Sequence, residues 1–179
     1  GFILEDIETV RNTINEVIEI YGDRIAEQNE SVFHGLIQSI CLLKGDKHRL
    51  ASESYSGFGR IDSIFYPVKG KSDTIIIHEY KIIKELKDEA QLKTVLSKAI
   101  WQMYDKVYTD VPLVRNKYFA EEAKSVELRA IVILCDPDSR NGYTSEIVIR
   151  NHSIEEMKEI AAAFKSRPLD YAKIDALQV

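Results

Sequence analysis

One segment in the middle of the chain constrains the fold more than any other: residues 74–81 (TIIIHEYK). It is a nearly continuous apolar run that ends in charged side chains, as expected for a central strand buried on both faces. The longest apolar run of the chain, residues 130–135 (AIVILC), is also strand-sized. Strands buried on both faces need helices above and below the sheet. The sequence therefore predicts an α/β fold with a mixed central β-sheet flanked by helices.

Apolar periodicity predicts the other elements. Residues at helical spacing indicate amphipathic helices, and short apolar or alternating runs indicate strands. We expect helices at residues 3–25, 29–44, 85–108, 113–124 and 153–165, and strands at residues 50–56, 60–67, 74–81, 126–135 and 145–150. Ser153 and Glu156 form a capping box at the start of the last helix. The order helix, three strands, helix, two strands, helix is typical of an α/β sandwich.

The N-terminal helix differs in charge from the rest of the chain. Residues 1–30 carry a net charge of -6, and the other 149 residues carry +1. The apolar positions of this helix follow a heptad seam made of Ile3, Ile7, Val10, Ile14, Val17, Tyr21 and Ile25. We expect residues 1–28 to pack on the core without contributing a catalytic group, and a coiled coil is the alternative. Because the acidic excess belongs to this helix, it argues little against a nucleic-acid partner. The same acidic surface favours a contact with a protein partner.

Composition limits the classes of protein to which the chain can belong. With 45% hydrophobic and 30% charged residues, the chain is globular and long enough for one substantial core. No apolar run approaches the length of a membrane helix. Cys41 and Cys135 lie among apolar residues without a CxxC partner, so we expect buried thiols and an intracellular, reducing compartment. The chain begins at Gly1, and we expect it to be a piece of a longer protein.

Charged residues stand inside two predicted strands. Asp62 lies within RIDSIF, where alternation puts Ile61, Ser63 and Phe65 on the other face. Glu79 and Lys81 are two apart and project on one side of their strand. If the two strands form a hairpin, Asp62 approaches the same face. Carboxylates are ligands for Mg2+ or Mn2+, and a lysine can position water or stabilise a phosphate. A buried salt-bridge cluster is the alternative.

Three sequence blocks with matching order and spacing surround these residues. They are Glu53-x3-Gly57-x-Gly59-Arg60-x-Asp62, then Ile75-Ile76-Ile77-x-Glu79-x-Lys81, then Ala99-Ile100-Trp101-Gln102-Met103 with Tyr108 six residues after Gln102. Together they resemble the PD-(D/E)XK nuclease superfamily, and most of all its bacterial branch found beside AAA-ATPase-like domains. The match runs from Asn29 to Cys135. The resemblance implies a restriction-endonuclease-like core, and hence a nuclease domain at residues 29–179 after the N-terminal helix.

The resemblance also implies roles for particular residues. Asp62 and Glu79 would bind Mg2+ or Mn2+, together with the carbonyl of Tyr80 and the side chain of Glu30. Lys81 would position the attacking water. Gln102 would orient the site, and it would touch the substrate together with Arg60 and Tyr108.

Several of these residues also have simpler interpretations. Glu30 is an acid in a first helical turn, which the helix dipole favours. Gln102 could be a solvated helix residue, Tyr108 a cap on the apolar face, and Arg60 a surface residue. His34 is expected to pack or orient. His78 departs from the family's aliphatic residue, and it either shuttles protons or points to the opposite face.

The sequence thus predicts a metal-dependent nuclease whose substrate is nucleic acid, with DNA favoured. The alternatives are a catalytically inactive nuclease-fold module that binds protein or nucleic acid, and a small acidic interaction domain without a site. Endonuclease and exonuclease action both stay open, as do the oligomeric state and roles in defence, repair or as a toxin or effector.

Overall fold

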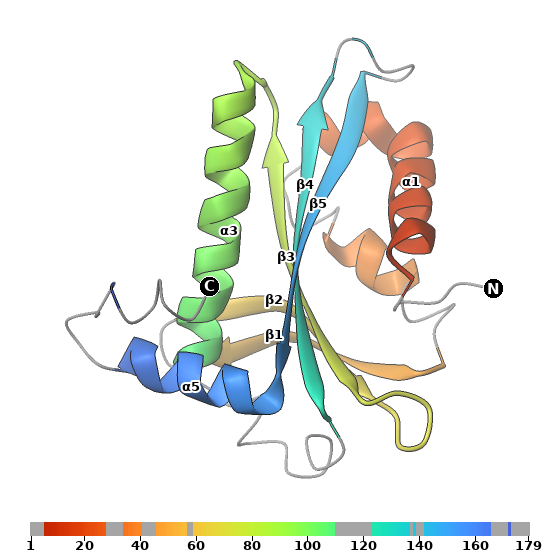
Figure 1. The fold of residues 1–179 in the computed structure, drawn as a ribbon. Helices are drawn as coiled ribbons and strands as arrows, with labels where there is room; N and C mark the ends of the chain where they lie inside the picture. Colours follow the sequence, from red (N-terminus) through yellow and green to blue (C-terminus); the bar gives the residue numbers. More distant parts are fainter. Residues whose placement is uncertain are drawn as a thin grey trace.

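The computed structural model describes residues 6–27, 34–40, 46–56, 59–109, 123–136, 138, 142–165 and 172. They form one mixed β-sheet with helices on both faces (Figure 1). In chain order the elements are α1 (Ile7–Glu27), β1 (His48–Ser56), β2 (Gly59–Pro67), β3 (Thr74–Ile83), α3 (Glu89–Thr109), β4 (Ser125–Cys135), β5 (Tyr143–Ser153) and α5 (Ile154–Lys165). Residues 34–40 are a further helical segment. The predicted α/β class with a mixed, helix-flanked sheet is confirmed.

The five strands lie in sequence order, β1-β2-β3-β4-β5. β1, β2 and β3 form an antiparallel meander, β3 and β4 are parallel, and β5 returns antiparallel to β4. A parallel pair needs a long crossover, and α3 provides it. This topology makes β3 the middle strand and leaves β1 and β5 at the edges.

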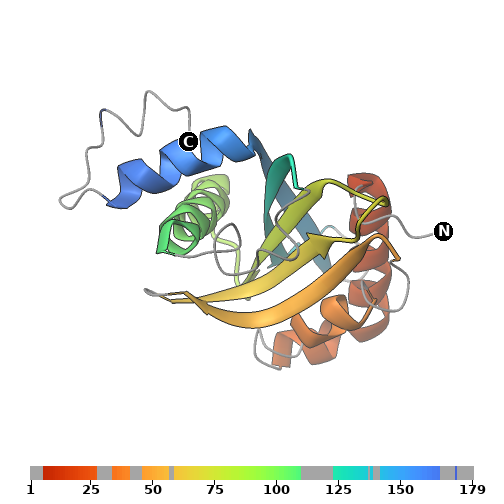
Figure 2. The ribbon, with the colours of Figure 1, turned by 90° about the horizontal axis from the view of Figure 1, so that it is seen from below.

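β3 is buried on both faces, as its sequence predicts. Ile75 and Ile77 pack in the apolar cluster under α3 and α5, and Ile76 and Tyr80 pack in the cluster under α1. Figure 2 shows α3 and α5 on one side of the sheet and α1 on the other. We call these the α3 face and the α1 face. Glu79 stands in sequence with Ile75 and Ile77, so the strand alternation directs it to the α3 face.

α1 packs on the sheet with a buried stripe that differs from the predicted heptad seam. Val10, Ile14 and Val17 are buried as expected, but Ile18 is buried as well and Tyr21 is 41% exposed. A straight helix has 3.6 residues per turn, so a strict seven-residue seam drifts away from a flat sheet. The prediction for Tyr21 is therefore wrong.

Helix starts are set by side-chain caps. α3 begins at Glu89 instead of the expected residue 85, because the Asp88 carboxylate accepts a hydrogen bond from the Gln91 N–H (2.7 Å) and caps the helix there. The capping box of α5 is confirmed, since Ser153 N–H donates to Glu156 Oε2 (2.8 Å) and Glu156 N–H donates to Ser153 Oγ (3.1 Å).

The remaining expectations are matched in part. The strand expected at 145–150 is longer and starts at Tyr143. The expected helix 113–124 falls mostly outside the described residues, and residues 123–124 are not helical. The helix expected at 29–44 is helical in its described part, residues 34–40. Among the described helices, none is long and apolar enough to span a bilayer.

Candidate active site

The candidate site lies where β2 and β3 stop pairing. The register between these strands runs from Phe65 opposite Ile76 to Ser63 opposite His78. Beyond this last pair, the Tyr80 N–H donates to the side chain of Asp62, at 3.0 Å from Oδ2. A carboxylate thus takes the place of a strand carbonyl, and it keeps the two strands joined while their backbones separate.

The backbone of Asp62 is also held from the α1 face. Its carbonyl accepts hydrogen bonds from His34 Nε2 (2.8 Å) and Gln38 Nε2 (3.1 Å), both from helical segment 34–40. These bonds turn the carbonyl away from the sheet ladder. In agreement, Ile61 packs in the α3-face cluster with Ile64, and the prediction that Ile61 shares a face with Ser63 and Phe65 is wrong. The strand alternation is interrupted at Asp62 because its carbonyl bonds to a helix.

Glu79 and Lys81 form an ion pair on the α3 face. Lys81 Nζ lies 3.0 Å from Glu79 Oε1. Glu79 is 1% exposed, whereas the Lys81 side chain is 27% exposed. A buried carboxylate is costly unless it is paired, so the ammonium compensates its charge from the solvent side. The two residues therefore connect the interior of the sheet to the surface.

Tyr80 links the pair to Asp62. It stands between Glu79 and Lys81 in the chain, and its N–H is the donor to Asp62. In a strand the N–H and C=O of one residue point to the same edge, so the Tyr80 carbonyl also faces β2. The structure thus brings the carboxylate of Asp62, the backbone of Tyr80 and the Glu79–Lys81 pair together at one end of the β2–β3 hairpin.

His34 and Gln38 support this arrangement from the α1 face of the sheet. They are one helical turn apart, and Gln38 Nε2 also donates to Ser63 Oγ (2.8 Å). The His34 ring stacks at 4.9 Å from the Tyr80 ring in a tilted arrangement. His34 therefore orients Asp62 and packs against Tyr80, which agrees with the packing or orienting role expected from the sequence. Gln38 is not among the residues predicted from the sequence, although its spacing of four from His34 is a usable signal.

Gln102 lies on the flank of α3 that faces away from β5. The α3 residues that line a groove against β5 are Lys93, Leu96, Ser97, Ile100 and Trp101. Since successive helix residues turn by about 100°, Gln102 lies on the opposite flank, where α3 meets β2. It is half-buried there. The predicted role of Gln102 at the site stays a prediction.

His78 points away from the site. Its ring is fully buried on the α1 face, where Nδ1 and the Tyr80 hydroxyl are hydrogen-bonded at 2.8 Å. Burial is the main cause that lowers the pKa of His78 well below 6.5, and the nearby Arg129 guanidinium adds to the effect. Because Glu79 faces the other side of β3, His78 is not placed to shuttle protons there.

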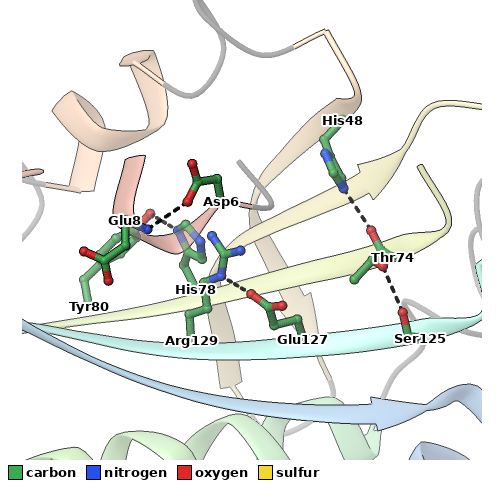
Figure 3. A network of polar contacts seen from close by, with 9 residues as sticks. All are labelled: Asp6, Glu8, His48, Thr74, His78, Tyr80, Ser125, Glu127 and Arg129. Carbon is green, nitrogen blue, oxygen red and sulfur yellow. Dashed lines mark hydrogen bonds and ion pairs between the residues drawn. The ribbon is translucent and has the colours of Figure 1, made fainter. Parts of the chain in front are cut away.

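A second buried charge stands beside His78 on the neighbouring strand. Arg129 is opposite His78 in the β3–β4 register and is fully buried, with its Nε paired to Glu127 (Figure 3). Its Nη1 and Nη2 atoms make no hydrogen bond. In the same figure His48 Nε2 lies 2.9 Å from the Thr74 carbonyl, which ties β1 to β3. The sequence analysis did not single out Arg129, because a lone arginine in a strand gives no signal of burial.

Part of the predicted site lies outside the described residues. These are Glu30 and Gly57 entirely, and the side chains of Glu53, Arg60 and Tyr108. In the part of the chain that the structure describes, no three His, Cys, Asp or Glu side chains gather as a group that could hold a metal. Of the metal ligands that the resemblance implies, the structure describes the carboxylates of Asp62 and Glu79 and the backbone of Tyr80.

Comparisons of the chain with protein-family models, with curated proteins and with solved structures gave no significant match.

Proposed function

We propose that this chain is a metal-dependent nuclease that hydrolyses phosphodiester bonds, with DNA as the favoured substrate. One observation carries the proposal: Asp62 is tied through the Tyr80 N–H to the buried Glu79–Lys81 pair, where β2 and β3 part. Two carboxylates and an ammonium on neighbouring strands, partly open to solvent, are a set of groups suited to phosphoryl chemistry. The sequence resemblance described above supports the same conclusion.

The donor set fits a hard divalent cation. Mg2+ is commonly held by one or two carboxylates and completes its shell with water and substrate phosphate oxygens. Asp62 and Glu79 would hold it, and the Tyr80 carbonyl faces the same edge. Glu30 is the further carboxylate that the sequence offers. When bound, the ion lowers the pKa of its water and offsets charge on the phosphate.

Lys81 would act on the reacting phosphate as a cation. It is held by Glu79 at 3.0 Å while 27% of its side chain stays exposed, so a substrate can reach the ammonium. In that ion pair it is a hydrogen-bond donor, suited to positioning water and stabilising the charge that develops on phosphate oxygens. We therefore assign it to orientation and charge stabilisation and not to proton abstraction.

The other residues of the hairpin would position these groups. His34 and Gln38 fix the Asp62 carbonyl from the α1 face, so the carboxylate can face β3. Gln102, on the flank of α3 near β2, would contact the substrate backbone or orient the site. The acidic α1 lies on the opposite face of the sheet. A polyanionic substrate would therefore approach from the α3 face.

A catalytically inactive binding module is the second candidate. The Glu79–Lys81 contact by itself is also what a structural ion pair looks like. The two candidates differ in whether phosphodiester bonds are broken.

The test is an assay of purified wild-type protein on supercoiled plasmid, linear duplex DNA and single-stranded RNA. Each substrate is incubated with Mg2+, with Mn2+ and with excess EDTA. The proposal expects cleavage of DNA that needs the divalent ion and stops with EDTA. Cleavage of RNA alone would correct the substrate class. No cleavage of any substrate under any metal condition would favour the binding module.

A further inference from the structure

A groove between α3 and β5 lies apart from the candidate active site. It is lined by Lys93, Leu96, Ser97, Ile100, Trp101, Val148 and Arg150. Its volume is about 360 Å³, which is within the range of sites that hold small ligands. It opens on the flank of α3 opposite Gln102, beside the edge strand β5, whereas Glu79 and Lys81 belong to the middle strand.

The lining of the groove combines an apolar floor with a cationic rim. Leu96, Ile100 and Val148 supply aliphatic surface, and the Trp101 ring is braced by Phe164 at a centroid distance of 5.7 Å. Lys93 and Arg150 come from different elements, and none of the described residues that line the groove is acidic. The two charged side chains of the described lining are therefore both cationic, in a chain of net charge -5.

Both cations can engage an anion. Lys93 is paired with Glu89 one turn before it, at 2.9 Å, but the side chains are 73% and 79% exposed. Such an exposed pair contributes little, so a phosphate can replace the carboxylate. Arg150 donates one hydrogen bond, from Nη1 to the Ile149 carbonyl (2.9 Å), and a guanidinium has five donors.

We propose that this groove binds one nucleotide unit of a single-stranded nucleic acid, with the base against Trp101 and the phosphate between Lys93 and Arg150. A flat base matches an aromatic and aliphatic slot, and stacking on an aromatic ring is tolerant of sequence. A phosphate matches two cations that line the same groove from separate elements. An acidic peptide would satisfy the cations but would leave the aromatic floor without a flat partner.

This site would work independently of the metal centre. Groove and candidate active site lie on opposite flanks of α3, so a strand held in the groove is anchored away from the reacting bond. Binding there needs neither Glu79 nor a divalent ion. Binding of a strand in the groove is therefore separable from nuclease activity.

Trp101 is the only tryptophan in the chain, so its fluorescence reports directly on the groove. The probe is a short oligothymidylate titrated in EDTA into the wild type and into Arg150→Glu, Lys93→Glu and Lys158→Glu. Lys158 is exposed on α5 and provides the matched charge reversal away from the groove. We expect saturable quenching of the wild type and of Lys158→Glu. In each groove variant we expect affinity weaker by roughly tenfold or more, the loss typical of one charge-assisted hydrogen bond.

The milder variants Arg150→Gln and Lys93→Gln, with circular dichroism spectra matching the wild type, cover the case in which a charge reversal disturbs folding. Equal affinity in all variants would overturn the proposal, as would the absence of saturable quenching. Quenching of the same strength by polyglutamate would show a general acidic-ligand surface and would also overturn it.

Discussion

The Asp62 carboxylate accepts a hydrogen bond from the Tyr80 N–H, 3.0 Å across the point where β2 and β3 cease to pair. Through this bond Asp62 can join the two strands and still have an oxygen available for the metal ion that we propose. One carboxylate oxygen replaces a missing strand acceptor, and a carboxylate has a second oxygen with acceptor sites of its own. The residue that donates the bond stands between Glu79 and Lys81. Substitutions at Asp62 should therefore disturb the Glu79–Lys81 ion pair.

The first prediction concerns metal binding. Adding Mn2+ should raise the melting temperature of the wild type, because only the folded site gathers the carboxylates. Asp62→Asn should lose most of this rise. The amide oxygen of the variant can still accept from the Tyr80 N–H, so its fold without metal should persist. Differential scanning calorimetry checks both points. An unchanged wild-type melting curve at millimolar Mn2+ would contradict a competent metal site.

The second prediction treats α1 as scaffold. Ile14 lies on α1 and is 1% exposed, so Ile14→Ala should lower the free energy of unfolding by about 2–5 kcal/mol. Ile20 on the same helix is 71% exposed, and Ile20→Ala should change it by less than about 0.5 kcal/mol. Urea denaturation measures both. Cleavage per folded molecule should stay at the wild-type level in both variants, and its loss in Ile14→Ala without a loss of stability would make the scaffold assignment wrong.

The third prediction is an acid dependence of stability. Burial is the main cause that lowers the pKa of His78 and of His152 below the ordinary 6.5. Above pH 6.5 both histidines are neutral in the folded and unfolded chains, so the full stability is present. As the pH falls through 6.5, the unfolded chain takes up these protons before the folded chain does. The free energy of unfolding should then fall by up to about 1.4 kcal/mol per pH unit for each histidine.

The variant His78→Gln isolates one of these protons. The amide can still bond to the Tyr80 hydroxyl, but it does not titrate. The slope of the unfolding free energy against pH, between pH 6.5 and pH 5, should become shallower by up to about 1.4 kcal/mol per pH unit, the contribution of one proton. Chemical denaturation at a series of pH values gives the slope. An identical slope in the variant and the wild type would show that His78 is not buried as a neutral ring.

The fourth prediction concerns the buried pair of Arg129 and Glu127. Glu127→Gln should destabilise the fold by several kcal/mol, about 3–5 in comparable buried pairs, because it leaves a buried guanidinium uncompensated. Arg129→Met should lower the free energy of unfolding much less, or even raise it. The substitution removes a buried guanidinium whose Nη1 and Nη2 make no hydrogen bond. Guanidinium chloride denaturation of the two variants ranks them. The reverse ranking would mean that Arg129 is better compensated than the structure shows.

The sequence predicted those features that depend on local pattern. The burial of β3 on both faces follows from three consecutive isoleucines, and the start of α5 follows from the Ser153–Glu156 capping box. Features that depend on contacts between distant elements could not be predicted. Arg129 is buried because the parallel register places it beside His78. The interrupted alternation at Asp62 arises from two donors on a helix that precedes it by more than twenty residues.

The candidate site shows the same division. Spacing alone put Glu79 and Lys81 on one side of a strand, and their ion pair follows from that. The approach of Asp62 depended on a β2–β3 hairpin, which the register confirms only as far as Ser63. Its bond to the Tyr80 N–H could not be read from spacing, because it requires the strands to separate at that position.

The most direct test compares plasmid cleavage by wild type, Lys81→Ala and Glu79→Gln, prepared in parallel and assayed with saturating Mn2+. Lys158→Ala, on the exposed side of α5, is the preparation control and should cleave like the wild type. Lys81→Ala should keep metal and DNA binding but cleave more slowly by a factor on the order of 10²–10³, the loss typical of one transition-state donor. Glu79→Gln should lose metal binding and cleavage together. Equal cleavage by all four proteins would contradict the assignment of Asp62, Glu79 and Lys81 as a nuclease centre.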